Sequence, residues 1–455
     1  MPRTGRAAIL ALPRTLIPGR TKTLFTTQQL FDEVGSSADV LRHAPFLERA
    51  RTERDRDREV AARLAVAAYV VARLVDRLLE GVHGEDMLEA FAWQTEAVRR
   101  HLADLPGDAP ETAHLAGIAE AVAPSGRVSP GLRLSLTAYA YFLEHEARLL
   151  EALDVLELSA RTHGERIPAA EFAAIALFAG RLRRLMALWG PANASYSAAE
   201  EAAHATADWV TVLRSRLGRC GVLRAQGNLP ASRALAESVL RTAEEQGLRD
   251  VQAMACADLG AVLVLQGLFG ESVQAKYRAF LLTEDGVQRM RVLGDLGVGL
   301  AQIGATAAAR TAFEIVVASQ TGFLVRMNAL LELMDLESEA DNRVAFERLR
   351  AEAESDRERM TPSMLADFIY KCGVGLARFG RLARARDVLA EGLRLTEANG
   401  LNAWYFRFER TLQGLGECAA CDAHEARSPA PAGLSDLPAI QEVALGLREY
   451  ALSTV

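Results

Sequence analysis

The chain has 455 residues, of which 50% are hydrophobic, 6% are aromatic and only 15 are proline, a composition that predicts packed helices and argues against a β-sandwich or a disordered chain. A formal charge of -7 and a pI near 5.8 argue against the broad basic surface that binds nucleic acid. Five scattered cysteines and the lack of an apolar stretch of roughly 18 to 20 residues predict a cytoplasmic protein without a membrane span.

Residues 1–45 are predicted to form a flexible basic arm with short helices. No acidic residue precedes Asp32, whereas positive charges occur at Arg3, Arg6, Arg14, Arg20 and Lys22. Targeting segments show a similar pattern, but the apolar stretch 7–12 ends at Pro13 and is short for a secretory signal. A flexible arm is therefore the leading interpretation, and a targeting segment is the alternative.

Within this arm, residues 27–43 loosely match the spacing of a helix-turn-helix DNA-binding motif. The match depends on Leu30, Val34, Gly35 and Leu41. Phe31 stands where the motif needs a small residue, and Ser36 stands where it needs an apolar one. Two interpretations stay open: a DNA-contacting element, or two short helices without a nucleic-acid role.

Residues 46–130 are predicted to be a helical cap region followed by a linker. Helices are expected at residues 59–79 and 85–105, and the first has an apolar face formed by Leu64, Ala67, Ala68, Val71, Leu74, Val75 and Leu78. The linker 106–130 contains one short expected helix. The dense charges that precede the first helix include Arg49 and Glu53 at i,i+4 spacing, which predicts a solvated helix face.

An internal repeat dominates residues 131–425. Its template is a small residue, then Leu three positions on, often Gly seven positions on, and a small residue twelve positions on. The clearest copy reads Gly260, Leu263, Gly267 and Ser272. Seven copies with a period near 40 residues begin at Ala140, Gly180, Cys220, Gly260, Gly297, Leu330 and Gly373.

Glycines at two phases of the template predict two antiparallel helices in each copy. Glycine inside a helix costs about 1 kcal/mol relative to alanine, so its recurrence at the first phase predicts that another backbone passes too close for a side chain. At the second phase, glycine supplies the left-handed residue that ends a helix. The glycines are Gly180, Gly260, Gly297 and Gly373 at the first phase, and Gly227, Gly267, Gly304 and Gly380 at the second.

This pattern resembles the tetratricopeptide repeat family, and Leu259-Gly260 and Leu296-Gly297 match its signature best. The early Trp, the Tyr and the closing Pro of the family are missing, and the period exceeds the usual length of about 34 residues. Longer repeats of this kind resemble the helical domains of bacterial regulators and peptide sensors. The resemblance implies an all-α, right-handed α-solenoid of about seven stacked antiparallel helix pairs, with N-terminal capping helices and a C-terminal helix.

The first helix of each tetratricopeptide pair lines the concave surface of the array, and the repeat register places a set of arginines there. They are Arg181, Arg184, Arg214, Arg224, Arg291 and Arg378. Guanidinium groups bind carboxylates in a bidentate way. We therefore expect a protein or peptide partner with acidic residues or a free C-terminal carboxylate. Solvated arginines without a common role are the alternative.

Residues 426–455 combine a proline-rich linker with an amphipathic helix expected at residues 437–452. The apolar stripe of this helix consists of Ile440, Ala444, Leu447 and Ala451. Two positions are open for the helix: packing onto the open end of the array, or lying in the groove of the array.

Catalytic and metal-binding motifs are sparse. Cys418, Cys421 and His424 have metal-ligand spacing, but a structural zinc site needs four ligands and no second pair lies nearby, so the candidate is weak. No Ser-His-Asp arrangement or nucleotide loop stands out, and no cofactor is expected. The sequence predicts a non-catalytic scaffold that binds a protein or peptide. The alternative is a transcription regulator in which residues 27–43 contact DNA and the repeats sense a peptide.

Overall fold

In the computed structural model of the chain, the described residues are 25–31, 41–122, 126–146, 148–319, 322–357, 360, 362–399, 401–417, 435 and 437–453. Within these ranges the fold is all-α, and the β structure is limited to an isolated antiparallel bridge between Phe25 and Ile167. The chain divides into two compact units, Met1–Asp208 and Trp209–Val455. The boundary falls between two helix pairs, and each unit is taken by itself below.

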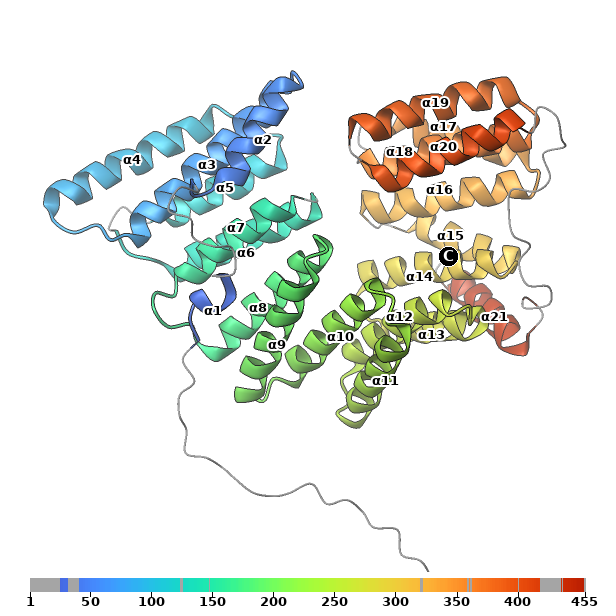
Figure 1. Ribbon diagram of the computed structural model, residues 1–455, viewed down its shortest axis with the longest axis horizontal. Coiled ribbons are helices and arrows are strands. Elements are labelled where there is room, and N and C mark those ends of the chain that lie inside the picture. The colour runs from blue at the N-terminus through green and yellow to red at the C-terminus, as the bar shows by residue number, and fades with distance from the viewer. Residues whose placement is uncertain are drawn as a thin grey trace, which may run out of the picture. The chain divides into compact units, whose positions relative to one another are not determined.

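The N-terminal unit contains cap helices followed by two helix pairs (Figure 1). Its described helices are α1 (Gln28–Phe31), α2 (Ala44–Asp55), α3 (Glu59–Leu79), α4 (Glu85–Ala103), α5 (Pro110–Ala121), α6 (Pro130–His145), α7 (Leu149–Arg161), α8 (Ala169–Leu185) and α9 (Trp189–Ala205). Helix α6 pairs with α7 and α8 pairs with α9, while α2 and α3 also contact α7. The cap helices therefore pack directly on the first pair.

The C-terminal unit continues the same pairing (Figure 1). Its described helices are α10 (Trp209–Ala225), α11 (Leu229–Glu245), α12 (Arg249–Leu265), α13 (Phe269–Leu282), α14 (Gly286–Gln302), α15 (Thr306–Ala318), α16 (Phe323–Glu339), α17 (Arg343–Ser355), α18 (Pro362–Arg378), α19 (Leu382–Ala398), α20 (Asn402–Glu417) and α21 (Pro438–Ser453). Each even-numbered helix from α10 to α18 pairs with the next helix, and α20 packs on α19. The predicted stacking of helix pairs is confirmed within each unit.

The predicted cap helices are also confirmed. Helix α3 has the expected bounds, and its seven predicted apolar positions are all buried. Helix α4 ends two residues earlier than expected, at Ala103, and the short helix of the linker is α5. The apolar periodicity was sufficient here because one face of each helix packs on its neighbours.

Every first helix ends with the same hydrogen bond. The N–H of the residue eight positions after the template start donates to the carbonyl of the residue three positions after the same start. In the copy that starts at Gly260, this bond runs from Leu268 N–H to Leu263 O at 2.9 Å. The residue seven positions after the template start has a left-handed backbone conformation, with φ of 79° at Gly227, 76° at Gly267, 78° at Gly304 and 73° at Gly380. This geometry is the Schellman helix end, in which glycine avoids the penalty of a Cβ atom. The predicted role of the second-phase glycines is confirmed.

The same hydrogen bond corrects one repeat register. In α16 the bond runs from Asn342 N–H to Glu337 O at 2.9 Å, and Asp341 has a φ of 55°. The copy therefore starts at Met334, one helical turn after the predicted start at Leu330. Both residues are completely buried, so the apolar pattern alone did not distinguish them. The corrected copy has Glu337 where five other copies have Leu.

First-phase glycines accommodate a side chain from the second helix, sixteen positions later in the sequence. A Cβ atom on Gly297 would lie 2.6 Å from Phe313 Cε1, and one on Gly373 would lie 2.5 Å from Leu389 Cγ. The sequence predicted a passing backbone instead, and a backbone atom approaches closely only at Gly260, where Ser272 O would be 3.2 Å away. The prediction of a close crossing was right, but the crossing atoms are mainly those of a large side chain.

The C-terminal helix α21 packs against α13 and α15, the second helices of two central pairs (Figure 1). Ile440, Val443 and Leu447 are buried in this contact, and Tyr450 meets Phe280 edge-on with ring centroids 5.0 Å apart. Helix α21 thus extends the apolar core of the C-terminal unit. It takes neither of the two positions that the sequence left open.

Two glycines of α14 provide a matched test of the crossing. We expect Gly297→Ala to lower the free energy of unfolding by about 1–3 kcal/mol, because the new Cβ overlaps the buried Phe313 ring. Gly294→Ala, three residues earlier, meets nothing within 4 Å and should raise stability by about 0.5–1 kcal/mol. Urea unfolding followed by circular dichroism measures both. Equal effects of the two substitutions would contradict the crossing.

Candidate functional site

The first helices of the C-terminal unit, α10, α12, α14, α16, α18 and α20, form what we call the first-helix surface. Ion pairs join neighbouring members of this set. Arg224 NH1 on α10 lies 3.1 Å from Asp258 Oδ1 on α12. Arg378 on α18 contacts α16 twice, with NH1 2.6 Å from Asp335 Oδ1 and NH2 3.0 Å from Glu339 Oε1. These contacts hold the guanidinium groups in defined orientations.

Lys371 lies deeper between α16 and α18. Its Nζ is 2.9 Å from Glu332 Oε1 and 2.8 Å from Asp367 Oδ2, and the residue is only 5% exposed. Burial by itself lowers the pKa of Lys371, but the two carboxylates outweigh it and raise the pKa above its ordinary value. A permanently charged lysine therefore connects the two helices.

Aromatic side chains occupy the α18–α20 end of the surface. The Arg407 guanidinium lies 4.2 Å from the centroid of the Tyr370 ring and 5.0 Å from that of Trp404. The Tyr370 hydroxyl is 3.0 Å from Thr411 Oγ1. Cations over aromatic rings at these distances attract the ring electrostatically. At this end of the surface the Arg407 guanidinium group therefore lies over the aromatic rings of Tyr370 and Trp404.

A lysine of a second helix reaches the first-helix surface between α12 and α14. The Lys276 stem passes Gly260, where a Cβ would lie 2.8 Å from Lys276 Cγ, and its Nζ donates to Asp295 O at 3.2 Å. Burial lowers the pKa of Lys276 and raises the pKa of Asp295. The Asp295 side chain is nevertheless exposed to solvent.

Two of the six predicted arginines, Arg224 and Arg378, are held by the carboxylates described above. Arg181 and Arg184 belong to the N-terminal unit. The Nε of Arg181 is 2.5 Å from Glu144 Oε1, an ion pair without the geometry of a hydrogen bond. The Nε of Arg184 donates to the Tyr196 hydroxyl at 3.3 Å.

The other two predicted arginines, Arg214 on α10 and Arg291 on α14, have exposed side chains. Within the described part of the chain, neither makes a hydrogen bond or an ion pair. Their guanidinium groups thus keep all their donors available to a partner. The proposed role of the six arginines in binding stays a prediction, and these two are the best placed for it.

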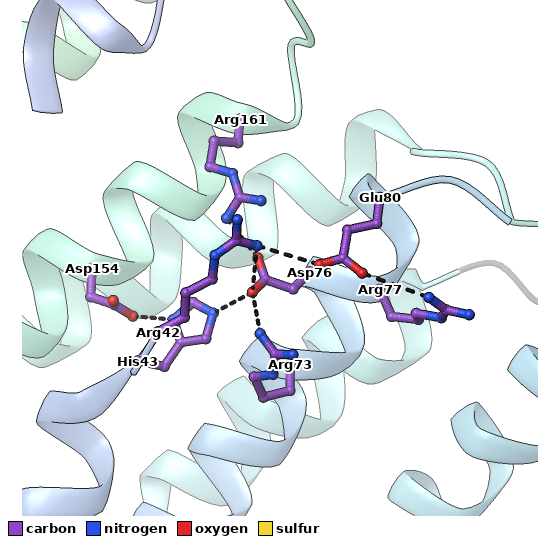
Figure 2. A network of polar contacts seen from close by, with 8 residues as sticks. All are labelled: Arg42, His43, Arg73, Asp76, Arg77, Glu80, Asp154 and Arg161. Carbon is purple, nitrogen blue, oxygen red and sulfur yellow. Dashed lines mark hydrogen bonds and ion pairs between the residues drawn. The ribbon is translucent and has the colours of Figure 1, made fainter. Parts of the chain in front are cut away.

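A cluster of charged side chains surrounds Asp76 of α3 in the N-terminal unit (Figure 2). Asp76 is completely buried, and His43 Nε2 lies 3.2 Å from Asp76 Oδ2. The same carboxylate meets Arg73 NH1 at 2.8 Å and Arg161 NH1 at 2.6 Å. Figure 2 shows His43 between Asp76 and Asp154. The Oδ2 atom of Asp154 is 2.6 Å from His43 Nδ1.

This cluster connects the cap helices to the first helix pair. His43 precedes α2 with a left-handed φ of 61° and is 5% exposed. Burial favours the neutral ring, but the hydrogen bonds to Asp154 and Asp76 outweigh it and raise the pKa of His43 from 6.5 to about 9. Both ring nitrogens are engaged, so the charged imidazolium is not available as a general base. Its role in this arrangement is structural.

The sequence pattern did not reveal this cluster. The one local signal was Asp76 itself, an acid between the apolar Val75 and Leu78 of the buried face of α3. The predicted solvated face is confirmed at Arg51 and Asp55, which are exposed, but not at Arg49. Arg49 NH2 instead lies 3.2 Å from Glu111 Oε2 on α5, because α2 and α5 place these side chains together in the cap.

Several sequence predictions fall on residues outside the described ranges. Cys418, Cys421 and His424 all do, so their metal site stays a prediction. Among the residues that are described, no group of three or more His, Cys, Asp or Glu is arranged to hold a metal ion. Likewise, no helix in the described ranges is both long and apolar enough to span a bilayer.

The candidate helix-turn-helix is described only in part, since residues 32–40 lie outside the described ranges. Its first portion contains the four-residue helix α1, in which Leu30 is 2% exposed. The next helix among the described residues, α2, begins at Ala44, after the segment has ended. The DNA-contacting interpretation stays a prediction.

Comparison with known proteins gives no family for the chain: no family model matches it, and no curated protein matches its sequence. Similar solved structures include apo RapI, at 11% identity and a TM-score of 0.42, covering 63% of this chain and 98% of that one. The apo quorum sensor NprR from B. thuringiensis gives 10% identity, a TM-score of 0.41, and coverage of 82% and 97%.

A third similar structure is the Rap conjugation regulator of plasmid pLS20 in complex with the Phr* peptide. It gives 13% identity and a TM-score of 0.41, with coverage of 73% of this chain and 97% of that one. Identities and TM-scores this low do not establish a shared family or a shared function. The functional conclusion therefore depends on the residues of this chain.

The His43 cluster predicts a specific dependence of stability on pH. Because folding raises the pKa of His43 from 6.5 to about 9, its contribution is complete below pH 6.5 and is lost as the pH rises through 9. Burial by itself raises the pKa of Asp76, but the hydrogen bond to His43 and the charge of Arg161 outweigh it and lower the pKa, so the contribution of Asp76 is lost only in acid. We expect stability to fall by up to about 3 kcal/mol between pH 6 and pH 9.5.

Urea unfolding of the wild-type protein and of His43→Gln at both pH values measures this effect. The variant lacks the titrating group, so its stability should change clearly less over the same interval. The difference between the two proteins removes the contribution of other groups that titrate near pH 9. Parallel pH profiles for the two proteins would show that folding does not raise the pKa of His43.

Proposed function

We propose that the chain is a non-catalytic scaffold that binds an extended peptide on the first-helix surface of its C-terminal unit. The observation that carries the proposal is the exposure of Arg214 and Arg291 on this surface without a hydrogen bond or ion pair in the described residues. A carboxylate is the ligand that a guanidinium fork binds most specifically. The peptide therefore carries acidic side chains or a free C-terminal carboxylate.

The neighbouring groups support this assignment. Arg224 and Arg378 are oriented by Asp258 and Asp335, so little side-chain freedom is lost when they contact a ligand. Met254, in the second turn of α12, and Leu265, its last residue, are 40% and 57% exposed and offer apolar contact. Stacked helix pairs provide the extended surface that such a peptide needs.

The proposal includes the compartment predicted from the sequence. Cys220, Cys256 and Cys372 are free thiols in the described part of the chain, and all three are buried. Burial raises the pKa of Cys256 to about 11, so the thiol stays protonated and unreactive at neutral pH. Free thiols of this kind suit the reducing cytoplasm.

Selection from a display library of random peptides with free C-termini tests the proposal. We expect the full-length protein to enrich acidic peptides, and the double variant Arg214→Glu/Arg291→Glu to bind them at least about tenfold more weakly, because two charge-assisted contacts become repulsive. Isothermal titration with a selected peptide gives the dissociation constants.

Arg241→Glu is the matched control, because Arg241 is an exposed arginine on the second helix α11. It makes the charge change of one of the two substitutions on a different helix and should leave affinity within about twofold. Selected peptides that bind the double variant as tightly as the wild-type protein would rule out the first-helix surface as their site.

A further inference from the structure

Arg183 occupies a position where the repeat itself requires a leucine. Five of the seven copies have Leu at this phase, namely Leu143, Leu223, Leu263, Leu300 and Leu376. Arg183 is only 4% exposed, although a buried charge is costly unless its surroundings provide matching groups. A residue that breaks the pattern of its fold at such a cost marks a specialised site.

The groups that meet Arg183 include a segment far away in the sequence. Its NH1 donates to Ser195 Oγ at 2.5 Å, and its NH2 donates to the backbone carbonyl of Leu30. Its guanidinium carbon lies 5.7 Å from the centroid of the Phe31 ring. Leu30 and Phe31 belong to α1, and the chain continues beyond α1 into residues outside the described ranges.

The other end of this segment has its own anchor. Phe25 is 5% exposed and stacks on Phe172 of α8, with ring centroids 4.5 Å apart and an interplanar angle of 29°. The Phe25 carbonyl accepts a hydrogen bond from Ile167 N–H at 3.0 Å, which forms the isolated antiparallel bridge. Leu30, which is 2% exposed, provides the second apolar anchor.

Together these contacts have the features by which proteins bind short linear peptides. One backbone hydrogen bond aligns an extended residue, two apolar side chains insert into packed surroundings, and a buried cation recognises a main-chain carbonyl. The described segment is only seven residues long, from Phe25 to Phe31. Its three anchoring side chains follow the pattern of an aromatic residue, four intervening residues, then Leu and a second aromatic residue.

We propose that Ile167, Phe172, Arg183 and Ser195 form a peptide-binding site in the N-terminal unit, and that residues 25–31 are an internal ligand of this site. Its ligand in trans is a peptide of the same chemistry, with an extended aromatic residue followed five positions on by a Leu-aromatic pair. The site goes beyond the function proposed above, because it lies in the other unit and selects apolar anchors instead of carboxylates. Either site can exist without the other.

Fluorescence anisotropy with a labelled synthetic peptide of residues 22–32 tests this site in the full-length protein. The variant Phe25→Ala/Leu30→Ala/Phe31→Ala removes the anchors of the internal ligand and should bind the probe. Wild-type protein should bind it at least about tenfold more weakly, because the internal segment competes at a millimolar effective concentration. Adding Arg183→Leu to the triple variant should abolish probe binding, because it removes the buried cation. Leu is the usual residue of the repeat at this phase, so the fold should be retained.

A scrambled peptide is the negative control, and circular dichroism verifies the helix content of each variant. The proposal is overturned if the triple variant does not bind the probe, if wild-type protein binds it equally well, or if Arg183→Leu has no effect. Appearance of dimers in wild-type protein, with the segment of one copy seated on another, would assign the site to self-association and would also overturn binding of a separate peptide.

Hydrogen exchange on the unmodified protein provides a second measurement that does not depend on the folding of a variant. The amides of Gln29, Leu30 and Phe31 in α1 donate to the carbonyls of Thr26 and Thr27, which precede the helix, and should exchange slowly. Excess probe peptide should displace the segment. Exchange of these amides should then become at least about threefold faster, because the population shifts toward molecules in which the segment is displaced. Unchanged exchange at saturating probe would contradict displacement.

Discussion

The close crossing between the two helices of each pair is the constraint on which the structure depends. At Gly297 the space of a Cβ atom is taken by Phe313, and at Gly373 by Leu389, so α14 and α18 need glycine at that phase, whereas α16 has Met334 there. The turn between the helices has the same 2.9 Å hydrogen bond in all seven copies. Because these contacts span few residues, each pair is defined locally, and stacking then buries its remaining apolar faces.

Two of the buried charges lie where the chain departs from this template. Glu337 and Arg183 replace the usual Leu, and both are less than 5% exposed. Glu337 is compensated within the fold, with Oε1 3.1 Å from Arg310 NH2 and Oε2 accepting from Asn342 Nδ2 at 2.7 Å. Arg183 relies in part on a segment outside the repeats. Removing one partner of a buried charge is strongly destabilising, so both positions tolerate little change around them.

Ion pairs have a different role on the first-helix surface. They join neighbouring first helices and hold Arg224 and Arg378 close to carboxylates, while Arg214 and Arg291 keep their donors exposed. A surface with some arginines already oriented loses less conformational entropy when it binds a ligand. The same surface is acidic along α16, which carries Glu332, Asp335 and Glu339 at intervals of three and four residues. The exposed positive charges that remain available to a ligand are therefore those on α10 and α14.

The sequence by itself determined the helices and most of the repeat phase. Helix α3 begins and ends as predicted, and the left-handed turn residues Gly227, Gly267, Gly304 and Gly380 were identified, because both signals are local. Only the tertiary structure decided which charges meet. His43, Asp76 and Asp154 are far apart in the sequence, and their pairing depends on how α2, α3 and α7 pack. For the same reason, the sequence placed Arg224 and Arg378 on the first helices but did not reveal the carboxylates that hold them.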